Sequence, residues 1–153
     1  MSHIAPLGKV QHSGTYNGLW LSTMAGLAFW DAITAPHFYE EFLGRCERLY
    51  QGINEAMRRT GIQGRVQATG ARFTLFFGPL AEKEPILNYR DTAANDWETA
   101  QRFYAIALRH GLYFHSAWHQ GISAMHTDAD IDLALERIEL ALGDLKQDGA
   151  SPV

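Results

Sequence analysis

Apolar residues recur every three or four positions in three stretches of the chain, at 38–57, 97–108 and 131–145. This spacing places them on one face of an α-helix, so each stretch predicts an amphipathic helix with a buried face. Gly61 and Gly111 follow the first two stretches and are typical of the residue that ends a helix.

Polar residues mark where the second and third of these helices start. Asn95 and Glu98 have the spacing of a capping box, in which each side chain accepts from the other residue's backbone N–H. We expect the last helix to start at Thr127, where Asp128 and Asp130 favour the positive end of the helix dipole.

Residues 19–32 follow a different pattern, because nearly all of them are apolar or small. This pattern predicts a helix that packs on several sides, and such a helix needs a larger body to pack against. Ser22, Thr23 and Asp31 interrupt the run, which is also too short to span a bilayer. We therefore expect a buried helix and no membrane partner.

Two short runs rich in β-formers, at 66–69 and 73–77, are separated by a Gly-Ala turn and predict an antiparallel pair. Further strand candidates lie at 112–115 and 122–125, and the segment 78–90, which contains two prolines, is predicted to be a loop. This order of helices and strands predicts an α+β fold, with a small antiparallel sheet and helices packed on one face.

Composition excludes some classes of function. The net charge is −4 and the 13 Lys and Arg residues are mostly scattered, which argues against a nucleic-acid partner. The single cysteine, Cys46, cannot form an internal disulfide, so a cytoplasmic location is expected. Cys46 falls on an apolar helix stripe, so we expect it to be buried and unreactive. The start MSHIAPLGKV does not have the apolar core of a signal peptide.

The histidines near the end of the chain are candidates for a metal site. The sequence has no dinucleotide fingerprint, P-loop, H-E-x-x-H or G-x-S-x-G motif. His115, His119 and His126, with Asp128 nearby, are of the types that bind a divalent metal. Their strand-and-loop setting does not place them on one helical face. We therefore favour ordinary strand-end or interface histidines, with a metal site as the alternative.

The turn from His12 to Gly18 combines flexible backbone, hydroxyl groups and the start of a helix. Backbone N–H groups and the Thr15 hydroxyl at a helix amino end would form a site for a phosphate. Gly and Ser or Thr before a helix are also common capping residues, so spacing alone favours a cap.

Four segments, in order, carry a resemblance to a known family. They are IAPLGKVQHSGTYNGLWLSTMAGLAFWD, GRVQATGARFTLFFG, LNYRDTAANDWETAQRFYAIALRHGLYFHS and ISAMHTDADIDLALERIELAL. They resemble the C-terminal portion, or small domain, of class III pyridoxal-phosphate (PLP) aminotransferases, closest to the glutamate-1-semialdehyde 2,1-aminomutase branch. The resemblance implies the C-terminal-domain fold of fold-type I PLP enzymes, and a homodimer in the intact protein.

In that family PLP forms a Schiff base with a large-domain lysine that lies upstream of the Gly-Thr motif. Lys9, Lys83 and Lys146 do not match that lysine. The resemblance thus implies that this chain alone binds no PLP, has no catalytic residue and is inactive. Thr15 matches the family threonine that reaches the PLP phosphate, usually that of the partner subunit. Gly14 accompanies it as backbone beside the phosphate.

The sequence departs from the family pattern in places that bear on substrate. Leu19-Trp20 stands where the family commonly has Asn-Pro. The loop at 115–120 is shorter than in the aminomutases and has no acidic residue. The carboxylate-binding arginine of the ornithine aminotransferases has no counterpart in this region. The resemblance therefore leaves the substrate open.

The resemblance predicts a linker with the Gly-Thr motif at 1–18, a single α+β small domain at 19–146 that begins with an interdomain helix, and a frayed tail at 147–153. The predicted function is that of the C-terminal domain of a PLP-dependent aminotransferase or aminomutase, whose partner is a large PLP-binding domain on the same or a separate chain. The alternative is a non-catalytic binding or assembly module, or one half of a split aminotransferase, that docks through residues 19–32.

Overall fold

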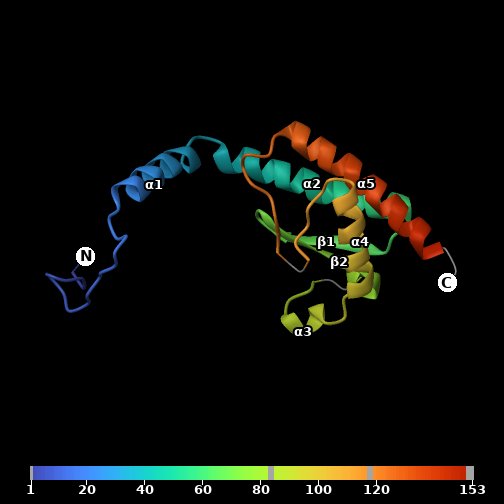
Figure 1. Cartoon of the computed structure of the whole chain (residues 1–153), viewed down its shortest axis with the longest axis horizontal. Helices are drawn as coiled ribbons and strands as arrows, with labels where there is room; N and C mark the ends of the chain where they lie inside the picture. Colours follow the sequence, from blue (N-terminus) through green and yellow to red (C-terminus); the bar gives the residue numbers. More distant parts are fainter. Residues whose placement is uncertain (1, 83–84, 117–118, 151–153) are drawn as a thin grey trace. The chain divides into compact units, whose positions relative to one another are not determined.

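The structure of the chain, a computed structural model, describes residues 2–82, 85–116 and 119–150. Its contacts divide the chain into two units, 1–39 and 40–153. The elements in chain order are α1 (Trp20–Ile33), α2 (Phe38–Thr60), β1 (Gly64–Thr69), β2 (Arg72–Phe77), the 3-10 helix η1 (Gly78–Glu82), α3 (Tyr89–Thr92), α4 (Trp97–Arg109), β3 (Gln120–Gly121) and α5 (Asp128–Ala150) (Figure 1). The three predicted amphipathic helices are α2, α4 and α5, and α5 continues four residues beyond the predicted start of the tail at 147.

A three-stranded antiparallel sheet, in the order β1-β2-β3, forms the base of the second unit. β1 and β2 pair over their full lengths, which confirms the predicted antiparallel pair. Gly70 turns the chain with a φ of 54°, a left-handed value that glycine adopts without a Cβ clash. The Tyr50 hydroxyl on α2 donates to the Gly70 carbonyl oxygen at 2.9 Å, and this bond holds the turn against α2.

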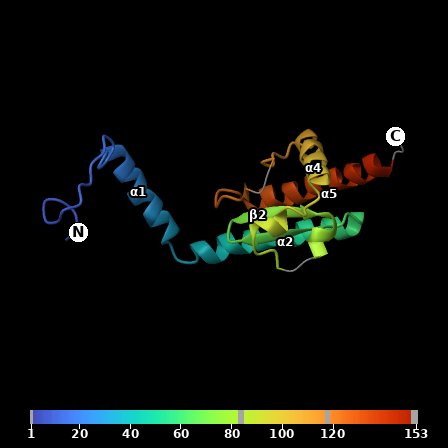
Figure 2. The same ribbon diagram turned by 90° about the horizontal axis from the view of Figure 1, so that it is seen from below.

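One face of the sheet is covered by α2, α4 and α5 (Figures 1 and 2). Side chains alternate along β2, so that Phe73, Leu75 and Phe77 join the core while Arg72 and Thr74 lie on the opposite face. The helices contribute the other fully buried side chains of this core, which include Cys46, Ile53, Met57, Phe103, Ile131, Ile138 and Leu142. The predicted α+β fold, with helices packed on one face of a small antiparallel sheet, is confirmed.

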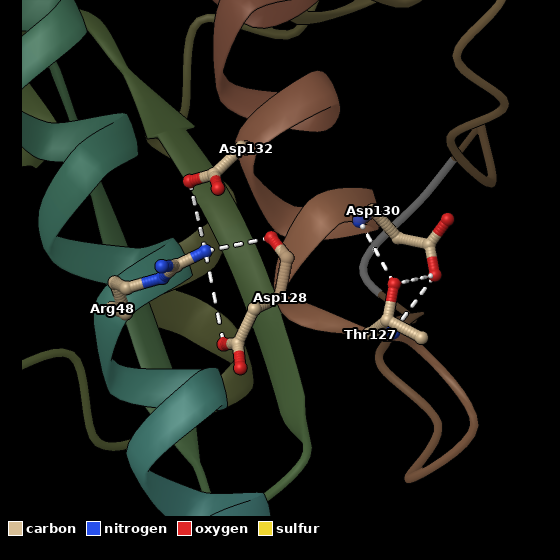
Figure 3. A network of polar contacts seen from close by, with 5 residues as sticks. All are labelled: Arg48, Thr127, Asp128, Asp130 and Asp132. Carbon is tan, nitrogen blue, oxygen red and sulfur yellow. Dashed lines mark hydrogen bonds and ion pairs between the residues drawn. The ribbon is translucent and has the colours of Figure 1, made fainter.

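Helices α2 and α5 lie side by side and run in the same direction (Figure 1). The Arg59 guanidinium donates to both carboxylate oxygens of Glu139, at 2.8 and 2.9 Å. Nearer the start of both helices, Arg48 Nη2 donates to the Asp132 carboxylate at 2.9 Å and to the Asp128 carbonyl oxygen at 2.8 Å (Figure 3). Exposed ion pairs of this kind contribute about 0–1 kcal/mol, so we infer that they align the helices more than they stabilise them.

The start of α4 differs from the prediction. The N-cap is Asp96, whose carboxylate accepts from the Thr99 backbone N–H at 3.0 Å. Asn95 is buried instead, and its Oδ1 accepts from the Phe77 backbone N–H at 2.8 Å. The predicted capping box of Asn95 and Glu98 was therefore wrong. Both Asn and Asp are good caps, and the sequence pattern does not show that the last N–H of β2 needs a buried acceptor.

The start of α5 agrees with the prediction, because Thr127 caps it. The Asp130 backbone N–H donates to Thr127 Oγ1 at 3.2 Å, and the Thr127 backbone N–H donates to the Asp130 carboxylate at 2.8 Å (Figure 3). The Thr127 backbone N–H and the Thr127 hydroxyl both donate to the Asp130 carboxylate, and these two bonds hold the pKa of Asp130 below its ordinary value. The two residues form a reciprocal box of the kind that starts helices.

The strand candidates at 112–115 and 122–125 were wrong, since the third strand is only Gln120–Gly121. A side chain replaces the expected ladder: Gln120 Oε1 accepts from the His115 backbone N–H at 2.9 Å, and Gln120 Nε2 donates to the His115 carbonyl oxygen at 2.7 Å. The segment 78–90 was also not simply a loop, because it contains η1 and the start of α3.

The first unit contains α1, and none of its 14 residues is buried. The side chains left exposed are large and apolar, with Trp20, Leu21, Phe29 and Trp30 between 62% and 72% exposed. The helix was predicted correctly, but the first unit, described by itself, leaves it exposed. Among the described residues, no helix is both long enough and apolar enough to cross a membrane.

Candidate functional site

The Gly-Thr motif forms a turn directly before α1. The Asn17 backbone N–H donates to the Gly14 carbonyl oxygen at 3.0 Å, and the Leu19 backbone N–H donates to the Tyr16 carbonyl oxygen at 3.1 Å. These two bonds reverse the chain twice within six residues, so that Thr15 lies on the exposed side of a tight turn.

Thr15 does not cap α1. The N-cap is Leu19, which makes no side-chain capping bond, and the Thr15 hydroxyl has no hydrogen-bond partner among the described residues. The first backbone N–H groups of α1 are therefore left for solvent or a ligand. An uncapped helix amino end attracts an anion, because its free N–H groups and the helix dipole act in the same direction.

The Gly-Thr turn of the first unit offers hydrogen-bond donors to an anion. Gly14 and Thr15 offer backbone and hydroxyl donors of the type that a phosphate accepts. Lys9 is an exposed residue of the same unit, Lys146 is an exposed residue of α5, and Lys83 lies outside the described residues. The donor set of Gly14 and Thr15 thus suits a phosphate group.

The histidine cluster is only partly brought together. The rings of His115 and His119 lie 6.2 Å apart between centroids. The His126 ring is engaged elsewhere, with Nδ1 3.0 Å from the Ser123 backbone N–H. Within the described ranges, no group of three or more His, Cys, Asp or Glu side chains is placed to hold a metal ion.

Cys46 lies in the core of the second unit, as predicted, with 2% of its surface exposed. Burial raises the pKa of its thiol, so the thiolate that would act as a nucleophile is disfavoured. Burial also raises the pKa of Tyr104 to about 12, which keeps that hydroxyl neutral at physiological pH. Neither side chain is suited to act as a nucleophile or base at neutral pH.

The face of the sheet away from the helices carries a shallow hollow of about 340 Å³. The described residues that line it are Gln67, Ala68, Thr69, Arg72, Phe73, Thr74 and His119. The set contains a guanidinium, an imidazole and two hydroxyls, and no carboxylate. Arg72 was not among the candidate site residues predicted from the sequence. The sequence could have indicated Arg72, because it alternates with Phe73 in a half-buried strand, and this alternation places Arg72 on the face opposite the core.

No family model matches the chain. Glutamate-1-semialdehyde 2,1-aminomutase from Bordetella avium is 35% identical over 148 residues, which is 95% of this chain and 34% of the aminomutase. The chain is a homologue of part of these aminomutases. This confirms the predicted relationship, and it also means that the chain spans about a third of the length of the curated relatives it matches.

Solved structures agree with the aminomutase relationship at the level of the fold. An ω-transaminase from Sphaerobacter thermophilus superimposes with a TM-score of 0.76 at 22% identity, over 89% of this chain and 30% of the transaminase. A transaminase with PLP bound superimposes with a TM-score of 0.74 at 19% identity, over 96% of this chain and 33% of its own. This chain therefore has the fold of about one third of these transaminases.

Proposed function

We propose that this chain is the C-terminal domain of a PLP-dependent aminotransferase or aminomutase that transfers an amino group only when a larger PLP-binding domain is present. The observation that carries the proposal is 35% identity along nearly the whole chain to an aminomutase of which it matches a third. On this proposal 1–18 is a linker, 19–146 is the small domain and 147–153 is its tail. The isolated chain is then inactive.

The proposed partner surface is α1. Trp20, Leu21, Phe29 and Trp30 expose large apolar side chains on a helix with no buried residue. Contiguous exposed apolar surface is typical of an interface, and covering it is favourable by about 25 cal/mol per Å². We propose that the larger domain covers this helix in a cytoplasmic homodimer.

The proposed cofactor contact is made by Thr15 and Gly14. The Thr15 hydroxyl and the backbone N–H groups of the turn would donate to the PLP phosphate, and the uncapped end of α1 would add the attraction of its dipole. PLP supplies the electron sink of the reaction when it is bound. The role of this chain is to hold the phosphate, in the partner subunit of the homodimer, and to orient the cofactor.

A chimera tests the proposal. In Bordetella avium aminomutase, this chain would replace the homologous third of the sequence. We expect the chimera to form a dimer and to retain PLP through gel filtration, as measured by the absorbance of bound cofactor. A dimeric chimera that holds no PLP, while the parent aminomutase holds it, would contradict the proposal.

Thr15 variants of the same chimera test the phosphate contact. A hydrogen bond to a charged group contributes about 1.5–3 kcal/mol, so Thr15→Ala should weaken PLP retention by about tenfold or more. Thr15→Ser keeps the hydroxyl and should retain PLP. Thr23→Ala is a matched control, because the Thr23 hydroxyl already donates to the Leu19 carbonyl oxygen at 3.0 Å. Equal PLP loss in Thr15→Ala and Thr23→Ala would count against the contact.

The exposed surface of α1 also favours a second candidate function, in which the chain is one half of a split aminotransferase or an assembly module. In that case the large domain is a separate polypeptide that binds α1 with measurable affinity. The coding sequence immediately upstream distinguishes the two candidates: an in-frame large domain with a lysine favours the first, and a separate reading frame for that domain favours the second.

A further inference from the structure

The hollow on the open face of the sheet is a separate feature from the Gly-Thr turn, and it belongs entirely to the second unit. Arg72 and Thr74 reach it from β2, and Thr69 reaches it from β1. Arg72 is paired across the sheet with Gly121. Its Nη1 lies 3.5 Å from where a Cβ on Gly121 would be, so the guanidinium extends over the backbone of β3.

Arg72 differs from Arg48 and Arg59 of the same unit in its hydrogen-bond partners. The Arg48 and Arg59 guanidiniums each donate to a carboxylate, on Asp132 and Glu139. Arg72 has no hydrogen bond or ion pair with any described residue, although it lies at a fixed position in a regular strand. A guanidinium held on a rigid element without a carboxylate partner is ready to bind one from a ligand.

We propose that this hollow binds a small molecule that carries a carboxylate, with Arg72 as its charge partner. The guanidinium presents two parallel N–H groups, which match the two oxygens of a carboxylate. Thr69 and His119 line the same hollow and are polar residues available to the rest of the molecule. A volume of about 340 Å³ is at the lower end for ligand pockets and suits a molecule the size of an amino acid.

The lining set favours a carboxylate over a phosphate group. Arg72 is the one Lys or Arg among the described lining residues, so it matches a single negative charge. Phosphate sites generally combine several cations or an array of backbone N–H groups. The proposal rests on the second unit alone, so it does not depend on whether the chain serves a PLP enzyme.

Solution NMR on the full chain tests the proposal. A ¹⁵N-labelled sample is titrated with sodium glutarate at constant ionic strength, with sodium chloride replaced step by step. We expect saturable shifts of the Gly70 and Gly121 amides, because Gly70 lies in the β1–β2 turn just before Arg72 and Gly121 pairs with Arg72 on β3. Arg72→Gln should weaken binding at least tenfold, and Arg72→Lys should weaken it less, because the charge is kept and the paired N–H groups are lost.

Arg58→Gln is the matched control, since the Arg58 side chain on α2 is 75% exposed and Arg58 is not among the residues that line the hollow. This variant should bind glutarate as the parent does. The proposal is overturned if the shifts do not saturate, if Arg58→Gln weakens binding as much as Arg72→Gln, or if inorganic phosphate binds at the same amides more tightly than glutarate. Melting curves of both variants establish that the fold is retained, and Arg72→Lys replaces Arg72→Gln if it is not.

Discussion

Replacing Asn95 by alanine tests how the sheet is joined to α4. Asn95 is 6% exposed, and its Oδ1 accepts from the Phe77 backbone N–H at 2.8 Å. Alanine removes that acceptor and leaves a buried N–H without a partner, which costs about 1–3 kcal/mol. Asn95 Nδ2 has no partner among the described residues, so its removal offsets part of this loss. We expect a net destabilisation of about 2 kcal/mol.

Urea and thermal unfolding, followed by circular dichroism, measure this change. For a unit of this size, 2 kcal/mol corresponds to a fall in melting temperature of roughly 8 °C. Asp96→Ala is the comparison, because Asp96 is half-buried and loss of an N-cap costs about 1 kcal/mol. An Asn95→Ala variant whose free energy of unfolding is within ~0.5 kcal/mol of the parent's would refute this prediction, because differences of that size are usual for surface substitutions. So would an Asp96→Ala variant that is the less stable of the two.

Three further predictions concern charge and cofactor. Hydrogen bonds from the Thr99 backbone and hydroxyl hold the pKa of Asp96 below its ordinary value of 3.8, so the stability linked to this carboxylate is present above that pH and is lost as the pH falls through the lowered pKa. Asp96→Asn should therefore show a shallower loss of stability than the parent in acid titrations below that pH. Arg59→Gln should change the unfolding free energy by less than about 1 kcal/mol, because the pair of Arg59 with Glu139 is exposed. It should also remove the part of the salt dependence of that free energy that this pair causes. A larger loss of stability would show that the pair does more than align the helices. Incubation of the chain alone with PLP, followed by borohydride reduction and peptide mass spectrometry, should give no stoichiometric adduct, and a stoichiometric adduct at Lys9 would contradict the proposed division of roles.

The helices and the hairpin could be predicted from the sequence because their burial is local and periodic. Ile53 and Met57, four positions apart, are both fully buried on α2. On α5, Ile138 and Leu142 repeat the same spacing and are also buried. In β2 the period changes to two, and Phe73 and the alternate residues after it face the core. Each pattern reflects contact with one continuous core, so it survives without knowledge of the partner element.

Features that depend on a single distant partner could not be predicted. The role of Asn95 depends on an N–H at the end of β2, 18 residues away in the sequence. The short β3 depends on Gln120, whose side chain satisfies the backbone of His115 in place of a neighbouring strand. Arg72 became a candidate only when the structure placed Thr69 and His119 beside it. The exposure of α1 could not be predicted, because apolar composition indicates that a helix is buried but does not show which chain it packs against.

The central claim is that a larger PLP-binding domain covers α1, and amide hydrogen exchange tests it most directly. The chain is measured alone and after mixing with the other two thirds of Bordetella avium aminomutase, made as a separate polypeptide. We expect the two parts to associate, and we expect exchange at residues 20–33 to slow by at least tenfold on mixing, with smaller changes on α5. A complex in which exchange at 20–33 is unchanged, or protection that appears on α5 instead, would contradict it.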